Sequence, residues 1–211
     1  PAHGRPITSP PQQGGNLGTR LGYEYKDETG QLLVTWTNGD AFTLFAENGT
    51  TSSVFTTQEN NKQSASFPGN DVTGEARNAF FPASRAEKRW QDCHYTVLGQ
   101  VIDAQKPTAQ RSDYNYMTAT GIAADANSIA FTHRIAVLKF SITLPDGKIP
   151  TTVSLSTQDD ADIDQATGIA VTAKAQDNTI LNTAKHLSAG IKNANTNSLG
   201  VYMAILPSTL N

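Results

Sequence analysis

Residue types that can act as nucleophiles or metal ligands are few in this 211-residue chain. Its one cysteine, Cys93, is followed by His94, and consecutive side chains of a strand point to opposite faces. The separations between the histidines match no zinc site; these residues are His3, His94, His133 and His186. A Cys–His nucleophile stays open as the alternative, because catalytic groups are brought together in space rather than by spacing. For His133, inside an apolar run, we expect a structural role.

An acidic cluster is the strongest hint of a metal site, and it is formed by Asp159, Asp160, Asp162 and Asp164. The last three have the spacing that opens a calcium loop, which then requires Gly and, at its twelfth position, Glu. Gln165 and Val171 stand at those two positions. A solvated acidic turn is therefore favoured over a structural metal site, and we expect no metal and no cofactor.

Several classes of function find no support in the sequence. It contains no G-x-S-x-G elbow, phosphate loop, G-x-G-x-x-G or H-E-x-x-H motif. The net charge of -3 gives no excess of basic residues of the kind that binds nucleic acid. The single cysteine excludes an internal disulfide framework. We expect no catalytic residues and predict that the protein is not an enzyme; a fragment of a secreted hydrolase is the least supported class.

Aromatic residues provide a second kind of candidate site, because a few exposed rings suffice to stack on a sugar. The residues concerned are Tyr23, Tyr25, Trp36, Trp90, Tyr114 and Tyr116. The other interpretation places Trp36 in the core and the tyrosines along the edge of a sandwich. Asn48-Gly49-Thr50 fits the N-glycosylation pattern, which matters only in a eukaryotic secretory pathway.

The elements that position these residues are predicted to be strands. Only 37% of residues are hydrophobic and 17% are charged, a composition typical of β-sandwiches with polar outer faces. Residues 32–36 and 41–45 read as two strands joined at Asn38-Gly39 in a hairpin. In the run 129–144 the apolar residues change from odd to even positions after Val137. Because alternate side chains face opposite sides of a strand, this change of parity indicates a bulge, a crossover between sheets or burial of both faces. Residues 199–205 alternate cleanly.

Three segments depart from this pattern. Residues 1–19 are rich in Pro, Gly and Gln and are predicted to form a flexible leader. Ser84 to Glu87 fits a capping box that starts one or two helical turns. Residues 182–193 offer a weak helix through Ala184, Leu187 and Ile191, although Gly190 disfavours it.

A series of short motifs, each weak alone, follows in a fixed order from residue 19 to about 145. They are Thr19-Arg20, Trp36-Thr37-Asn38-Gly39-Asp40, Phe42-Thr43-Leu44-Phe45, Ala65-Ser66-Phe67-Pro68-Gly69, Ala79-Phe80-Phe81-Pro82-Ala83, Tyr116-Met117-Thr118-Ala119, and Ile129-Ala130-Phe131-Thr132-His133. In this order the chain resembles the fimbrillin-like proteins of Bacteroidetes, the family of major and minor fimbrial subunits. Pro68, where the family often has Thr, and Phe80-Phe81, where Tyr is frequent, are mild departures.

The resemblance implies two transthyretin-like Greek-key β-sandwiches. We expect a leader at 1–19, a complete N-terminal sandwich at 20–125 and part of a C-terminal sandwich at 126–211. The chain begins on Pro1 without a methionine and stops early in the second sandwich, so a processed form or a fragment is expected.

The resemblance also implies a structural role at the cell surface. Members are exported as lipoproteins and become shaft, tip or anchor subunits of pili attached to the outer membrane. An arginine-specific protease removes an N-terminal strand, and a strand of a neighbouring subunit fills the groove. Arg20 stands where such cleavage is expected, with Arg5 as a second candidate. The expected partners are other pilus subunits and surface glycans or proteins. A non-polymerising adhesin or lectin-like module that binds glycans is the alternative function.

Overall fold

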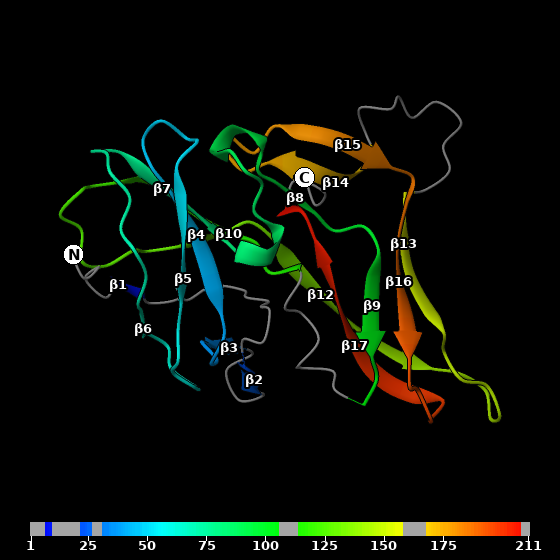
Figure 1. Cartoon of the computed structure of the whole chain (residues 1–211). Coiled ribbons are helices and arrows are strands. Elements are labelled where there is room, and N and C mark those ends of the chain that lie inside the picture. The colour runs from blue at the N-terminus through cyan, green and yellow to red at the C-terminus, as the bar shows by residue number, and fades with distance from the viewer. Residues whose placement is uncertain (1–6, 10–21, 27–30, 106–113, 158–167, 208–211) are drawn as a thin grey trace.

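The computed structural model of this chain describes residues 7–9, 22–26, 31–105, 114–157 and 168–207, with side chains from Val34 onward. Within these ranges the protein is all-β, as predicted, and contains no α-helix (Figure 1). The only helical turns described are two short 3-10 turns, η1 (Ala83–Arg85) and η2 (Trp90–Asp92). No helix in this part of the chain is long and apolar enough to cross a membrane.

A five-stranded antiparallel sheet forms the centre of the first half of the chain. Its order is β11 (Thr132–His133), β10 (Met117–Ile122), β7 (Arg77–Phe81), β4 (Ala41–Phe45) and β5 (Ser52–Thr56). Two short pairs accompany it: β1 (Ile7–Ser9) with β6 (Ala65–Phe67), and β2 (Gly22–Lys26) with β3 (Gln31–Thr35). They lie beside the large sheet on the left of Figure 1.

The hairpin predicted around Asn38-Gly39 is wrong in its pairing. The turn itself is present: Gly39 has φ 89, and Asp40 Oδ2 accepts the Thr37 N–H at 2.7 Å. However, β3 pairs with β2, whereas β4 pairs with β5 and β7. The turn carries the chain between sheets, because this route places Trp36 and Phe42 in one core.

Trp36 lies at the centre of that first core, with no exposed surface. Its ring makes edge contacts with Phe67, Phe81 and Phe131 at centroid distances of 4.9, 5.3 and 6.2 Å. We call first core the cluster Val34, Trp36, Phe42, Leu44, Ala46, Phe55, Ala65, Phe67, Val72, Ala79, Phe81, Met117, Ala119, Ile122, Ile129 and Phe131. The interpretation of Trp36 as a core residue is confirmed.

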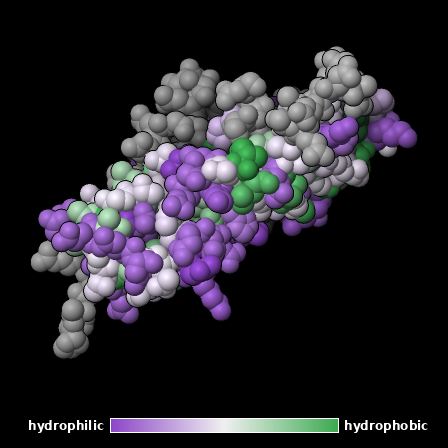
Figure 2. All heavy atoms as spheres, turned by 90° about the horizontal axis from the view of Figure 1, so that it is seen from above, coloured by the Kyte–Doolittle hydropathy of each residue, from purple (hydrophilic) through white to green (hydrophobic). Residues whose placement is uncertain are grey.

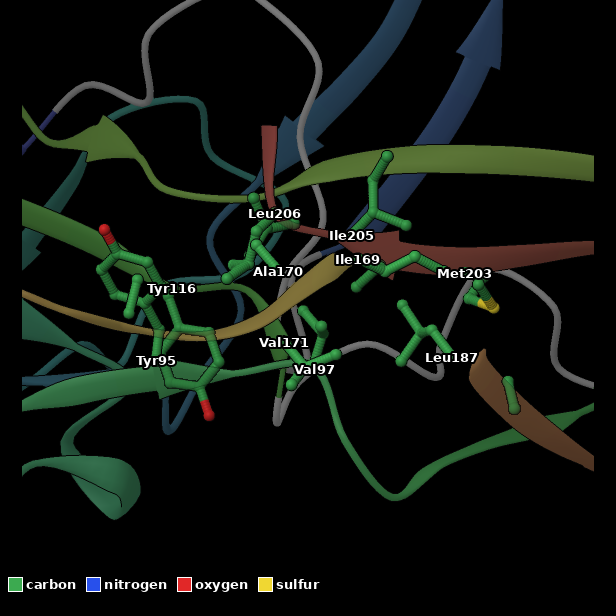
Figure 3. Packing of buried hydrophobic residues seen from close by; sticks show 14 of the residues in the cluster. Tyr95, Val97, Tyr116, Ile169, Ala170, Val171, Leu187, Met203, Ile205 and Leu206 are labelled. Atoms are coloured by element: carbon green, nitrogen blue, oxygen red, sulfur yellow. The ribbon is translucent and has the colours of Figure 1, made fainter. Parts of the chain in front are cut away.

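The remaining strands form three small sheets. They are β12 (Ala136–Thr143) with β17 (Ser198–Ile205); β13 (Thr152–Ser156), β16 (His186–Lys192) and β9 (Gln100–Asp103); and β15 (Ile180–Ala184), β14 (Ile169–Lys174) and β8 (His94–Thr96). All pairs are antiparallel except β9 with β16. These sheets enclose a second core that includes Tyr95, Val97, Tyr116, Ile169, Ala170, Val171, Leu187, Met203, Ile205 and Leu206 (Figure 3).

Strands from distant parts of the sequence meet in this second core. β8 and β9 precede residue 125, yet they pair with β14 and β16, which follow residue 168. The boundary near residue 125 remains a prediction. The helix predicted over 182–193 is wrong, because β15 and β16 occupy that segment. In β16, Leu187, Ala189 and Ile191 are buried alternately, and this period of two specifies a strand.

The central strands β4 and β7 of the five-stranded sheet are buried on both faces. Successive side chains of a strand point to opposite faces, and in β4 Phe42 and Leu44 enter the first core while Phe45 enters the second. In β7, Phe80 likewise belongs to the second core. The run 129–144 passes from one core to the other, with Phe131 in the first core and Ile135 in the second. The chain moves there from β11 of the five-stranded sheet to β12 of the β12–β17 ladder, so a crossover between sheets, one of the three explanations offered, is present.

Aromatic contacts join the face of this sheet that carries Phe45 and Phe80 to the strands around the second core. The Phe45 and Trp90 rings lie 5.9 Å apart, and Tyr116 is 5.9 Å from both Phe80 and Tyr95. Trp90 also donates its main-chain N–H to the Gly49 carbonyl at 2.8 Å. The two halves of the chain are therefore packed together through buried rings.

Candidate functional site

The N-terminal strand β1 pairs with β6, the strand whose Ala65 and Phe67 belong to the first core. Three residue pairs define the antiparallel register, Ile7 with Phe67, Thr8 with Ser66 and Ser9 with Ala65. β1 and β6 together form a two-stranded sheet, and they are separated by more than fifty residues of the chain. β1 falls within the predicted leader, where we predicted no strand. The β-branched pair Ile7-Thr8 is the one local signal for it.

The main-chain groups on the two edges of β6 find different hydrogen-bond partners. Ser66 donates its main-chain N–H to the Glu59 carboxylate at 2.8 Å. Because neighbouring residues of a strand direct their N–H and C=O groups to opposite sides, Ala65 and Phe67 are the residues that pair with β1. The side chain of Glu59 covers one edge, and the other edge accepts a strand.

The accepting edge is supported rigidly by the first core. Phe67 is fully buried and packs against Trp36 and Phe42, with the Phe42 centroid at 5.2 Å. A Cβ at Gly69 would approach the Phe55 ring within 2.6 Å, so only glycine allows the chain to pass there. Removal of β1 would therefore leave an ordered edge with main-chain groups ready for another strand.

The proposed cleavage residue Arg20 and the alternative Arg5 both lie outside the described residues. In sequence, Arg20 falls between β1 and β2, whereas Arg5 precedes β1. Cleavage after Arg20 would separate β1 from the remainder of the chain. Cleavage after Arg5 would leave β1 attached.

Cys93 is not placed as a nucleophile. Its side chain is buried, and its Sγ atom accepts the Glu87 N–H at 3.4 Å. Burial raises the pKa of the Cys93 thiol to about 11, so the thiol stays protonated near neutral pH. The His94 ring contacts the main chain instead, with its Nδ1 atom 3.1 Å from the Asp92 carbonyl oxygen.

The remaining predicted ligand residues form no metal site in the part of the chain that is described. There, no three His, Cys, Asp or Glu side chains are grouped to hold a metal ion. The acidic cluster lies outside the described residues; it comprises Asp159, Asp160, Asp162 and Asp164. His3 also lies outside them, and His186 is exposed on β16.

The rings proposed as a sugar platform are mostly inside the protein. Trp36, Trp90 and Tyr116 are buried. Tyr114 is half-buried, donates its hydroxyl to the Gly99 carbonyl at 2.7 Å and lies beneath the Arg85 guanidinium. The side chains of Tyr23 and Tyr25 are not among those described. The described rings therefore serve packing rather than an open stacking surface.

The surface seen from above is mainly hydrophilic, with hydrophobic residues concentrated in a small central area (Figure 2). The exposed large hydrophobic residues of the described chain are Val54, Leu98, Val101, Ile149, Ile180 and Leu181. Only Ile180 and Leu181 are adjacent in sequence, on β15. Exposed apolar residues are common on protein surfaces and do not by themselves mark a ligand site.

His133 is a half-buried titratable group beside the first core. It ends β11 opposite Met117, and its Nδ1 lies 3.3 Å from Oδ1 of the fully buried Asn115. His133 Nε2 and Asn115 Nδ2 have no partner within the described part of the chain. Burial lowers the pKa of His133 to about 4, which keeps the ring neutral near pH 7.

Acidification is expected to weaken the fold through His133. The pKa is 6.5 for the ordinary group and about 4 in the folded protein, so the unfolded chain binds more protons between these values. The free energy of unfolding should fall by up to about 3 kcal/mol as pH decreases through that window. Urea unfolding at a series of pH values measures this, and His133→Gln should flatten the dependence. Exposed His186→Gln is the control that should not; an unchanged slope in His133→Gln would contradict the assignment.

Comparison with known proteins bears on the fold. No protein-family model and no curated protein matches this sequence. The solved structure of a candidate cell adhesion protein from Bacteroides ovatus aligns with 98% of this chain and 79% of its own, at a TM-score of 0.50 and 13% identity. The two proteins share a fold. A candidate cell adhesion protein from Bacteroides uniformis covers 96% of this chain and 74% of its own, at a TM-score of 0.49 and 17% identity.

Proposed function

We propose that this protein is a structural subunit of a bacterial surface pilus, at the shaft or the tip, and that it supports adhesion. The observation that carries the proposal is the β6 edge, which is ordered by the first core and occupied by an N-terminal strand of only three residues. The ordered motifs from residue 19 onward and the fold likeness to the Bacteroides ovatus protein add support.

The proposed assembly step is strand exchange at β6. A protease that cleaves after Arg20 releases β1, and Ala65 and Phe67 then lose their main-chain partners. Each of these hydrogen bonds contributes roughly 0.5–1.5 kcal/mol, so three pairs hold β1 only weakly once it is detached. A longer strand from a neighbouring subunit gains more main-chain bonds along the same edge and displaces it.

The proposed location follows from the same role. The subunit is exported as a lipoprotein precursor and acts outside the cell, in a pilus attached to the outer membrane. Its partners are other subunits of the pilus, and surface glycans or proteins are candidate adhesion targets. Burial of Trp36, Trp90 and Tyr116 removes part of the surface that a lectin-like module would need, so the pilus subunit is preferred.

Arginine replacement tests the cleavage step. Arg20→Ala is expected to abolish maturation by a trypsin-like protease and to abolish fibres seen by electron microscopy, because β1 stays attached. Arg5→Ala is the matched control, since cleavage at Arg5 leaves β1 in place, and its fibres should be normal. Fibres from Arg20→Ala would contradict the cleavage site. Monomers that persist after cleavage and bind a glycan array would favour the adhesin instead.

Direct binding of a peptide tests the β6 edge. A form lacking residues 1–20 should bind a synthetic peptide of residues 1–19, as measured by fluorescence anisotropy. Proline at Ile7 removes an N–H that faces β6, and it should weaken binding at least tenfold. Proline at Thr8 is the control, because in this register the Thr8 N–H faces away from β6. Equal loss with both peptides would show that the register is wrong.

A further inference from the structure

A buried amide side chain connects two sheets of the second core. Gln100, at the start of β9, is 2% exposed. Its Nε2 group donates to the carbonyl oxygens of Val97 and Ala204, each at 2.8 Å, and its Oε1 accepts the Ala204 N–H at 2.8 Å. Every polar atom of the side chain is therefore used, and one residue of β17 is held by both of its main-chain groups.

This arrangement substitutes for a neighbouring strand. The N–H and C=O of a strand residue point to the same side, so Ala204 directs both groups away from β12 and toward Gln100. β9 itself pairs in parallel with β16, from Ala189–Gln100 to Lys192–Asp103. The Gln100 amide thus joins the two-stranded β12–β17 ladder to the three-stranded sheet of β13, β16 and β9. β9 and β17 lie beside each other in Figure 1.

The position of Gln100 along the ladder is mechanically significant. β12 and β17 are antiparallel over eight pairs that run from Ala136–Ile205 to Thr143–Ser198. The chain enters β12 from β11 of the five-stranded sheet and leaves β17 at the same end of the ladder, so tension between that sheet and the end of β17 acts at the Ala136–Ile205 pair. Force applied at one end of a ladder breaks its hydrogen bonds one after another. Gln100 holds Ala204, the residue next to that pair.

We propose that Gln100 is a mechanical clamp that protects the second core against tension along the chain. Its two bonds to Ala204 must break together, since one rigid amide plane carries both. The load on β17 passes through β9 into β16 and β13 instead of opening the β12–β17 ladder. Burial of Met203, Ile205 and Leu206 beside the clamp excludes water from these bonds. The clamp does not depend on strand addition at β6.

Single-molecule force spectroscopy on the full chain, pulled from its two ends, tests the clamp. Gln100→Met keeps the approximate volume and removes the amide, and it should lower the unfolding force of the second core to roughly half at a fixed loading rate. Leu187→Ala is the matched comparison, because Leu187 is buried in the same core on β16 but does not hold β17. It should reduce equilibrium stability comparably and the unfolding force much less. Gln100→Asn, with the amide one methylene short, replaces Gln100→Met if that variant does not fold.

A second pulling direction separates mechanical from general stabilisation. Handles on cysteines introduced at the exposed positions Lys148 and Asn195 load the opposite end of the ladder, and buried Cys93 does not compete for attachment. In this direction Gln100→Met should change the unfolding force little. An equal loss of force in both directions, or equal losses for Gln100→Met and Leu187→Ala, would overturn the clamp.

Discussion

Replacement of Trp36 by alanine is expected to lower the free energy of unfolding by about 3–5 kcal/mol, the range for a large aromatic residue lost from a packed core. Trp36 has no exposed surface and contacts Phe67, Phe81 and Phe131, which come from distant parts of the chain. The cavity would lie inside the first core, among Phe67, Phe81 and Phe131, where backbone collapse is restricted. Urea unfolding followed by circular dichroism measures the change.

Two comparisons make the Trp36 result specific. Trp36→Phe keeps an aromatic ring and should lose distinctly less stability than Trp36→Ala. Val54→Ala, on edge strand β5, should stay within about 0.5 kcal/mol of the wild type, because Val54 is 52% exposed. A loss below about 1 kcal/mol in Trp36→Ala would mean that the first core refills the space and that Trp36 is not its centre.

Replacement of Arg77 by leucine is expected to cost about 2–4 kcal/mol of unfolding free energy. The Arg77 side chain is 1% exposed, forms an ion pair with Asp71 and donates to the carbonyl oxygens of Ile122 and Ala123. These partners lie before β7 and at the end of β10, so one guanidinium holds two segments against the sheet. Leucine fills part of the space, but it leaves the buried carbonyl of Ile122 without this donor.

Replacement of Asp71, which forms the ion pair with Arg77, should cost less unfolding free energy than replacement of Arg77. Asp71 is 51% exposed, so water solvates it when the pair is broken, and Asp71→Asn should cost about 1 kcal/mol or less. Thermal and urea unfolding of both variants would measure this asymmetry. Equal losses for Arg77→Leu and Asp71→Asn would show that the ion pair, rather than the bonds to the two carbonyls, provides the stabilisation.

The sequence supported the strands more reliably than their partners. The predicted strand at 41–45 coincides with β4, and the run at 199–205 lies within β17. The run in β17 alternates because every second side chain faces the core, whereas Phe42 to Phe45 of β4 are all buried, as expected for a short apolar strand between two cores. The capping box at Ser84–Glu87 yields only the 3-10 turn η1, with Pro82 in the cap position and no side-chain cap bond. One turn without an apolar periodic segment behind it does not propagate.

At the candidate site, too, the sequence indicated a residue but not the strand pairing around it. Arg20 was predicted as a cleavage site from its place in the sequence. The β6 edge, from which cleavage at Arg20 would release β1, was not predicted. β1 is three residues long within a Pro- and Gly-rich segment, and its pairing with β6 closes a loop of more than fifty residues. No local pattern specifies such a partner, because strand pairing depends on the main chain and on the core beneath it.

The residues alone predicted that this protein is all-β, offered a core position for Trp36, and left a crossover between sheets as one of three explanations for the run 129–144. These properties follow from composition and from the period of two, which report the burial of each side chain. Only the tertiary structure decided that β8 and β9 join β14 and β16, that Gln100 holds Ala204, and that β6 accepts β1. The physical reason is that pairing is set by main-chain groups common to all residues, so the partner is selected by packing between distant segments.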